Sequence, residues 1–446
     1  MRQSSSPSDG LLGGLSGTPD VDAELSDSAV LQAMLDVEAA LARAAADAGV
    51  VPVPAADAIA AQCRAERYDP AALGRAADAT GNPVVPLVGE LTAAVPEHAR
   101  AWVHSGATSQ DVLDTALVLV AVRALGPLLT HLDVAVEAAA RLADAHRDTV
   151  MVARTLGQQA APSTFGLKAA GWLTGLAQAR DRLRQARAAQ PAQLGGAVGT
   201  LAAFGPAGAE VTERFAAHLG LPPSPLPWHT RRQPWLDLAA ALGGLLVATG
   251  KIALDVGLLA QNEVGEVAEG GAGRGGSSAM PHKRNPVDSI LVTAAARRGP
   301  GLVATLFATA VQEHERAAGG WHAEWEPLLD LLHVTGGATA RCARMLAGLQ
   351  VRPERMRENL DATGGLLLAE AVVARLAPAV GRRVAHDLVT RAAAAPSFRA
   401  ALLADPDVRA HLSDTELAEA LDPYRWLGSA GRFVDSALAA VRGARG

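Results

Sequence analysis

The sequence predicts an all-α protein. Segments rich in Ala and Leu, with apolar residues at helical spacing, follow one another along almost all of the 446 residues. Stretches of Val, Ile and Tyr with the period-two alternation typical of β-strands are nearly absent. Apolar residues make up 49% of the chain but aromatic residues only 3%, so Ala, Leu and Val must build the core.

The N-terminal region, residues 1–110, is predicted to form a helical domain. Its first long helix begins near Ser26 or Ser28, because serine is a favourable N-cap residue, and it ends at Gly49. A proline-rich break follows at residues 52–54. Shorter helices are expected in the rest of this region.

Long apolar helices predict a central bundle domain at residues 111–350. Thr108 and Asp111 form a plausible capping box for a helix that continues past Pro127. Two more long helices are expected, at about 162–189 and 234–269. Because these helices are apolar around most of their circumference, we expect them to be buried inside a bundle and between subunits.

A break in the helical pattern separates a small C-terminal helical domain, residues 351–446, at Val351-Arg352-Pro353. Before it, the glycine-rich segment 270–278 is too flexible for a helix and predicts a mobile loop. A helix should resume at Asn285. The chain is therefore expected to form a three-domain subunit.

Charge and composition exclude several classes of protein. The chain carries 40 basic and 46 acidic residues, a formal net charge of −6, and has no Lys/Arg tract, which argues against a nucleic-acid partner. Apolar runs such as 116–122 are too short to span a bilayer, and the Ser-rich start lacks a signal-peptide core. We therefore expect a cytoplasmic protein without a membrane partner, in which Cys63 and Cys342 are reduced and buried.

The strongest motif is the segment 276–286, Gly-Ser-Ser-Ala-Met-Pro-His-Lys-Arg-Asn-Pro. Asn285 is a good N-cap, and proline suits the first position of a helix. Lys283 would then lie beside a helix N-terminus, which favours anion binding, and Ser277 lies on a loop that can close over it. A solvated surface loop with ordinary capping is the alternative.

This segment resembles the signature of the fumarase/aspartase superfamily. Residues 104–115 and 154–164 resemble the first and second conserved regions of that superfamily, in the expected order. The resemblance covers nearly the whole chain. It implies a fumarase/aspartase-like fold and a homotetramer in which the three regions, each from a different subunit, meet in shared active sites.

The resemblance also implies roles for individual residues. Ser277 would exchange a proton at the carbon next to a substrate carboxylate, with His104 as the alternative proton carrier. The residues expected to bind substrate are Thr108, Ser109, Arg154, Thr155, Gln159, Lys283 and Asn285. Thr108 could instead serve only as a helix cap, and Gln159 only as a buried structural amide.

Leu156 departs from the superfamily pattern, in which many members have a histidine that handles a proton on the leaving group. Leucine cannot transfer a proton, and an amine is a poor leaving group unless it is protonated. A carboxylate leaves, or attacks, as a stable anion. Leu156 therefore favours lactonisation, in which a substrate carboxylate adds to its own conjugated double bond.

Three further stretches, 227–231, 312–325 and 368–371, resemble the 3-carboxy-cis,cis-muconate cycloisomerase branch of the superfamily. The resemblance implies a small tricarboxylate substrate, whose extra carboxylate Arg316, with Arg231 or His229, would bind. It implies no organic cofactor. No metal is expected either, since the histidines lack the spacing of a metal site. The alternatives are adenylosuccinate lyase or another fumarate-releasing lyase, and a catalytically silent structural protein.

Overall fold

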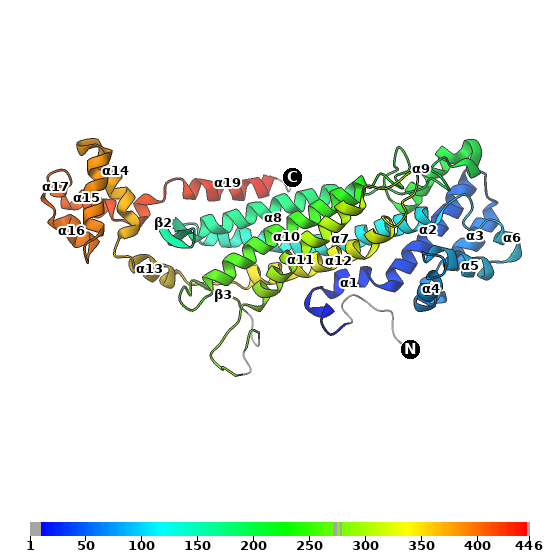
Figure 1. The fold of residues 1–446 in the computed structure, drawn as a ribbon, viewed down its shortest axis with the longest axis horizontal. Helices are drawn as coiled ribbons and strands as arrows, with labels where there is room; N and C mark the ends of the chain where they lie inside the picture. The colour runs from blue at the N-terminus through cyan, green and yellow to red at the C-terminus, as the bar shows by residue number, and fades with distance from the viewer. Residues whose placement is uncertain (1–9, 271–273, 277–278, 444–446) are drawn as a thin grey trace. The chain divides into compact units, whose positions relative to one another are not determined.

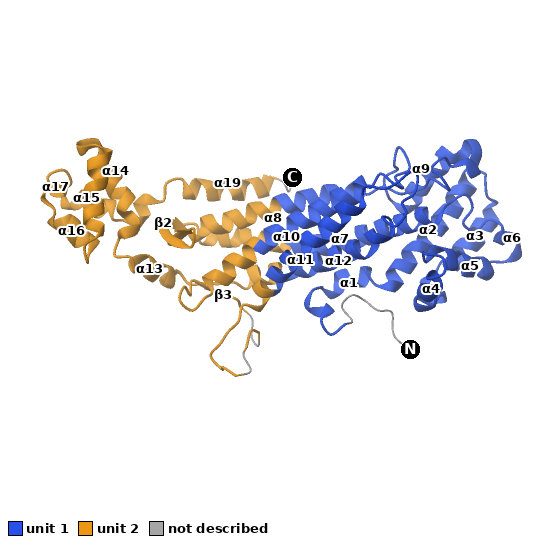
Figure 2. Cartoon of the chain, in the orientation of Figure 1, with its two compact units in different colours: residues 1–133, 178–250, 291–341 blue, residues 134–177, 251–290, 342–446 orange. Residues whose placement is uncertain are grey.

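The computed structural model describes residues 10–270, 274–276 and 279–443 (Figure 1). The chain consists of two compact units (Figure 2). Unit 1 comprises the residues up to Asp133, 178–250 and 291–341, and unit 2 comprises 134–177, 251–290 and the residues from Cys342 onward. Both units consist mainly of helices, which confirms the predicted all-α class. The division into domains at 110 and 350 stays a prediction.

The N-terminal helices of unit 1 form where the sequence predicts them. α2 (Asp27–Asp47) is capped by the Ser26 hydroxyl, which accepts from the Ala29 N–H at 3.3 Å, and it ends just before Gly49 at a φ of 74°. The neighbouring elements of this unit are α1 (Pro19–Glu24), α3 (Val53–Gln62), α4 (Pro70–Ala77), α5 (Val84–Ala94), α6 (Glu97–Arg100) and α9 (Gly208–Leu219).

Five long helices account for the apolar segments in the middle of the chain. They are α7 (Ser109–Ala145), α8 (Phe165–Ala188), α10 (Gln233–Leu259), α11 (Val287–Thr309) and α12 (Trp325–Ala347). Pro127 lies inside α7, as predicted. The expected helix 234–269 was predicted too long: α10 ends at Leu259, and the chain then turns through Gly265, at a φ of 65°, into strand β3 (Val267–Ala268).

α7 and α10 are long and apolar enough to cross a membrane by length and composition alone, so the prediction that the apolar runs are too short was wrong for these two helices. Within the protein, 78% of the most apolar window of α7 is buried, but only 44% of that of α10. Val247, Leu254 and Leu258, spaced by seven and four residues, leave one apolar face of α10 exposed.

The second signature region forms a β-hairpin that the sequence pattern did not reveal. Strands β1 (Val150–Thr155) and β2 (Gln158–Thr164) pair antiparallel, with an irregularity between Ala153 and Arg154. Leu156 and Gly157 form the two-residue turn, at φ angles of 50° and 79°. Positive φ at both positions is the conformation that joins twisted strands tightly. β3 pairs with β4 (Gln350–Val351) in a second small sheet.

The C-terminal part of unit 2 has a hydrophobic core of its own, built from Leu376, Leu388, Phe398, Leu402 and other side chains that are almost fully buried. Its helices begin close to the predicted break at 351–353. They are α13 (Pro353–Asp361), α14 (Ala369–Val380), α15 (Arg382–Ala393), α16 (Phe398–Ala404), α17 (Pro406–Arg409), α18 (Asp414–Ala420) and α19 (Ala430–Gly443).

Candidate active site

The first signature region reaches α7 through an unusual backbone. His104 has a φ of 55°, a left-handed conformation that a side chain other than glycine rarely adopts, and Gly106 follows at 76°. A Cβ atom on Gly106 would lie 2.4 Å from the ring of Phe204, so glycine is required there. The segment before α7 therefore has a specified, strained shape.

Asp111 fixes this segment to the rest of unit 1. Its carboxylate accepts from the N–H groups of Thr108 at 3.0 Å and of Gly195 and Gly196 at 2.9 Å. Its Oδ1 also lies 2.7 Å from Nε2 of His229, which is buried. One half of the predicted capping box, the bond from the Thr108 N–H to the Asp111 carboxylate, is thus present, whereas the Asp111 N–H donates to the Thr108 carbonyl and not to its hydroxyl. His229 is held inside the protein rather than at an open surface.

Arg316 lies against the same region. Its guanidinium donates to the Thr108 hydroxyl at 3.0 Å, to the Gln110 side-chain oxygen at 3.3 Å and to the Ala197 carbonyl at 3.1 Å. Because Thr108 Oγ1 accepts from Arg316, its own O–H proton stays available to a ligand. By contrast, Arg231 is exposed and its guanidinium donates to Ser224 at 3.4 Å, while Ser109 is the half-buried first residue of α7.

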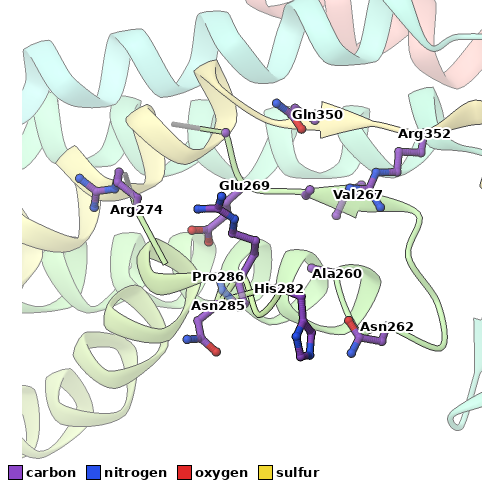
Figure 3. A pocket seen from close by; sticks show the side chains of 13 residues that line it. Ala260, Asn262, Val267, Glu269, Arg274, His282, Asn285, Pro286, Gln350 and Arg352 are labelled. Carbon is purple, nitrogen blue, oxygen red and sulfur yellow. The ribbon is translucent and has the colours of Figure 1, made fainter. Parts of the chain in front are cut away.

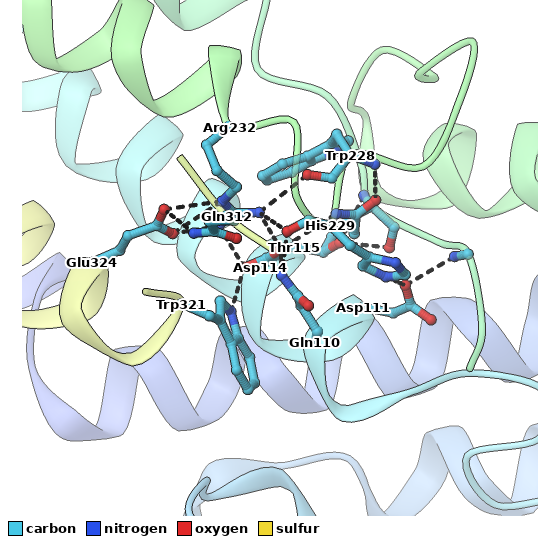
Figure 4. A network of polar contacts seen from close by, with 12 residues as sticks. Gln110, Asp111, Asp114, Thr115, Trp228, His229, Arg232, Gln312, Trp321 and Glu324 are labelled. Atoms are coloured by element: carbon cyan, nitrogen blue, oxygen red, sulfur yellow. Dashed lines mark hydrogen bonds and ion pairs between the residues drawn. The ribbon is translucent and has the colours of Figure 1, made fainter. Parts of the chain in front are cut away.

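Arg232, Asp114 and Glu324 form a buried ionic triad in the same unit (Figure 4). Arg232 donates to both oxygens of Asp114, at 2.7 and 3.0 Å, and to both oxygens of Glu324, with a shortest contact of 2.6 Å. The side chains of all three are at most 2% exposed. Trp321 donates its indole N–H to Asp114 at 2.9 Å, and the Arg232 guanidinium lies 4.7 Å from the centre of the Trp228 ring.

One carboxylate of the triad is shifted towards its neutral form. Burial raises the pKa of Glu324 to about 7, even though the hydrogen bonds and charge of Arg232 lower it. The nearby Asp114 adds to the upward shift, because two carboxylates share a single guanidinium. Gln312 completes the arrangement by donating to Glu324 at 2.8 Å.

In unit 2, Arg154 anchors the hairpin of the second signature region to the rest of the unit. Its guanidinium forms two hydrogen bonds with the fully buried Glu266, at 2.7 and 3.0 Å, and Asn359 donates to the same carboxylate at 2.8 Å. Thr155 and Gln159 are exposed near the tip of the hairpin, so the alternative of a buried amide at Gln159 is wrong for this chain. Arg154, a predicted substrate ligand, is therefore already paired with a carboxylate of its own chain.

The third signature region borders a cavity of about 600 Å³ (Figure 3). Its polar lining includes Asn262, Glu269, Arg274, His282, Arg284, Asn285, Gln350 and Arg352. Lys283 is exposed and lines an adjoining hollow. Ser277 lies outside the described residues. Arg284 and Arg352 form no ion pair with another described residue, so this cavity is suited to a small polyanion.

The N-terminus of α11 is capped by Glu269 and not, as predicted, by Asn285. The Glu269 carboxylate accepts from the Asp288 N–H at 3.0 Å and from the Ser289 N–H at 2.7 Å. The carboxylate therefore occupies the position at the helix end where an external anion would bind. The Asn285 amide instead donates to the Gly275 carbonyl at 3.2 Å, which closes the base of the signature loop.

Comparison with known proteins identifies the family. A family described as "Lyase" matches residues 16–301, and one described as "Adenylosuccinate lyase C-terminus" matches residues 365–437. The chain belongs to the fumarase/aspartase superfamily of lyases. This confirms the resemblance carried by the three signature regions.

Individual members of this superfamily match over nearly their whole length. Nitrosuccinate lyase of Streptomyces davaonensis is 47% identical over 439 residues, covering 95% of this chain and 92% of that protein. The 3-carboxy-cis,cis-muconate cycloisomerase of Pseudomonas aeruginosa is 48% identical over 427 residues, covering 94% and 93%. The crystal structure of the 3-carboxy-cis,cis-muconate lactonizing enzyme from Pseudomonas putida matches with a TM-score of 0.91 at 43% identity, covering 96% and 98%.

Within this superfamily fold, the predicted site residues fall into two groups. Unit 1 holds His104, Thr108, Ser109, His229, Arg231 and Arg316, and unit 2 holds Arg154, Thr155, Gln159, Lys283 and Asn285. In unit 1, Thr108 and Arg316 are in direct contact, whereas the Arg231 side chain is bound to Ser224.

Several residues that organise the site escaped the sequence analysis: Glu38, Asp114, Arg232, Glu266, Glu269 and Glu324. For Glu38 there was a signal, because a single acidic residue stands among Val37, Ala39, Ala40 and Leu41 on the buried side of a helix. For Arg232 there was none, since it is adjacent to another arginine and only the fold decides which of the two is buried.

We predict that Arg232→Met strongly destabilises the protein. The substitution leaves Asp114 and Glu324 buried without their guanidinium, which should cost about 3–5 kcal/mol of folding free energy. Urea-induced unfolding followed by tryptophan fluorescence measures this loss, since Trp228 and Trp321 contact the triad. The matched control is Arg231→Met at the exposed neighbour. Equal stability of the two variants would contradict the structural role assigned to the triad.

Proposed function

We propose that this chain is a 3-carboxy-cis,cis-muconate cycloisomerase. The observation that carries the proposal is the set of relatives with this activity, which are 40–48% identical in sequence, and the solved structure of one such enzyme, which matches with a TM-score of 0.91. The product would be 4-carboxymuconolactone, in the protocatechuate branch of the β-ketoadipate pathway, and the enzyme would work in the cytoplasm without a cofactor.

The chemistry at the tip of the β1–β2 hairpin supports this reaction. Leu156 occupies the turn, is fully exposed in the chain, and carries no group that can exchange a proton. In lactonisation a substrate carboxylate attacks as an anion, so no leaving group has to be protonated. A leucine at this position is therefore compatible with ring closure and unfavourable for expulsion of an amine.

In the proposed mechanism, a carboxylate oxygen of the substrate bonds to a carbon of the conjugated system and the electron pair moves towards the carbon next to another carboxylate. Lys283, Asn285 and the arginines of the cavity lining would bind the carboxylates and stabilise the enediolate-like charge. Ser277 would donate one proton to the adjacent carbon, with His104 as the alternative donor. No atom leaves the substrate.

The acidic chain can bind a tricarboxylate because its positive charges are local. In the cavity beside the signature loop, Arg274 is paired with Asp288, whereas Arg284 and Arg352 have no ion-pair partner among the described residues and can bind a ligand. In unit 1, Arg316 forms three hydrogen bonds and has two further N–H groups for the third carboxylate. Close to these arginines the electrostatic potential is positive, although the chain as a whole has a net charge of −6.

We propose that the enzyme is a homotetramer with active sites shared between subunits. α11 exposes Ile290, Ala294, Gly301, Ala304 and Ala308, whose spacing of four, seven, three and four residues keeps them on one face, together with the exposed Arg297. α10 also exposes an apolar face, defined above. Small and apolar residues at such spacing allow close helix packing against another copy of the chain.

A second candidate, elimination of nitrite from nitrosuccinate, is favoured by one observation. A nitrosuccinate lyase is 47% identical over 95% of this chain. Nitrite, like a carboxylate, is a stable anion that leaves without protonation, so the argument from Leu156 does not separate the two reactions. Both reactions also move a proton at the carbon next to a carboxylate. Adenylosuccinate lyase activity is disfavoured, because its leaving group is an amine.

We predict that the purified protein consumes 3-carboxy-cis,cis-muconate without an added cofactor. Loss of the absorbance of the conjugated diene measures ring closure, and chromatography against authentic 4-carboxymuconolactone identifies the product. Parallel reactions with nitrosuccinate, followed by nitrite release, and with adenylosuccinate provide the comparison. A kcat/KM for either of these that exceeds the value for the muconate would overturn the proposed function.

We predict that Ser277→Ala removes most of the turnover and leaves the oligomer intact. Alanine has no group that can replace a serine hydroxyl as the proton donor. Loss of a general acid typically lowers the rate by about 100-fold to 10,000-fold. Steady-state kinetics measure the loss and size-exclusion chromatography checks the assembly. Ser278→Ala is the matched control. Turnover near that of the unmodified protein would exclude Ser277 as the donor and leave His104.

A further inference from the structure

A buried carboxylate in the N-terminal helices lies directly behind His104. Glu38 Oε1, on α2, is 2.6 Å from His104 Nδ1, and the Glu38 side chain is 0% exposed. Sixty-six residues separate the two in sequence, so the fold brings them together. The contact lies within unit 1, at the start of the first signature region.

Glu38 is poorly explained as a stabilising residue. It stands on the buried side of an Ala/Leu-rich helix, and its second oxygen, Oε2, has no hydrogen-bond partner among the described residues. A buried carboxylate with an unsatisfied oxygen costs free energy that a packed apolar residue would not. A buried charge retained at such a cost points to a role outside folding.

The geometry of His104 indicates what that role is. Nδ1 is bound to Glu38 on the buried side, whereas the side chain as a whole is 19% exposed. Nε2 is thus the ring nitrogen left to meet a ligand. His104 is also held in a left-handed backbone conformation, a strain that is typical of functional positions. A carboxylate behind one nitrogen and an open position at the other is the arrangement that orients histidines for proton chemistry.

We propose that Glu38 is a positioning residue that holds His104 as an imidazolium with its Nε2–H directed at the substrate. In this role His104 supplies a charged donor to the negative charge that develops during ring closure. The proposal rests on the proposed function, since it assigns His104 a task in that reaction.

The charges around His104 agree with this assignment. Burial lowers the pKa of His104. The charge and hydrogen bond of Glu38 raise the pKa by more than burial lowers it, and the charge of Asp111 on α7 raises it further, so the net shift is upward. Asp111 is itself bound to His229 and to three backbone N–H groups. Among the described residues, Glu38 and Asp111 are thus the acidic groups that raise the pKa of His104.

A matched pair elsewhere in unit 1 provides the control. His333 Nδ1 lies 2.6 Å from Asp22 Oδ1, with side chains that are 5% and 0% exposed. This pair has the same carboxylate-to-imidazole contact, but its histidine is buried. Any effect that comes only from breaking a buried histidine–carboxylate contact should therefore appear in both pairs.

The test compares Glu38→Gln with Asp22→Asn. The imidazolium is lost as pH rises through the pKa of His104, so the alkaline limb of the kcat/KM profile should move to lower pH by about 1–3 units in Glu38→Gln. Asp22→Asn should leave the profile in place. Combining Glu38→Gln with His104→Asn should lower turnover no further than His104→Asn alone. An unchanged profile in Glu38→Gln, or additive losses in the double variant, would overturn the proposal.

A second measurement does not depend on turnover. The rate at which diethyl pyrocarbonate modifies His104, followed by peptide mass spectrometry as a function of pH, reports the pKa of that side chain. The pKa should fall in Glu38→Gln and stay constant in Asp22→Asn. If the unmodified protein fails to convert the muconate but the pKa of His104 falls as stated, the proposed function is wrong and the positioning role stands. A constant pKa would refute the positioning role itself.

Discussion

The geometry of unit 1 depends on the burial of one guanidinium. Arg232, the residue immediately before α10, binds Asp114 in the first turns of α7 and Glu324 just before α12. A buried arginine is tolerated only when its donors are satisfied, so the three segments must keep their relative positions. Asp111 lies one helical turn before Asp114, and its contacts with Thr108 and with residues 195–196 follow from that placement.

Carboxylates serve as internal anchors in both units. In unit 2, Glu266 neutralises Arg154 and Glu269 caps α11, while in unit 1 Glu38 holds His104. Each of these carboxylates binds a partner within the same chain. The acidic surplus of the sequence is therefore compatible with an anionic substrate, because the cations that line the cavity beside the signature loop are not paired with these acids.

The sequence was sufficient to predict the helical class, the positions of the long helices and the superfamily, because these depend on periodicity and on contiguous motifs. It was insufficient where two nearby residues compete for one role. Asn285 is a better N-cap by type, yet Glu269, which precedes the first residue of α11 (Val287) by a long loop, accepts from the N–H groups at the helix start. Arg231 and Arg232 are the same type of residue, and only the packing at the start of α10 decides which of them is buried. The hairpin turn at Leu156 needs positive φ at a residue that gives no such signal.

We propose that one active site takes His104 from one chain and Ser277 from another. Mixed tetramers formed from Ser277→Ala and His104→Asn chains test it most directly, since each variant alone should be nearly inactive. If the residues come from different chains, an equal mixture should regain about a quarter of the unmodified turnover, because each site draws the two residues independently. If mixing restores nothing while mixed tetramers form, both residues act from the same chain and the claim is contradicted.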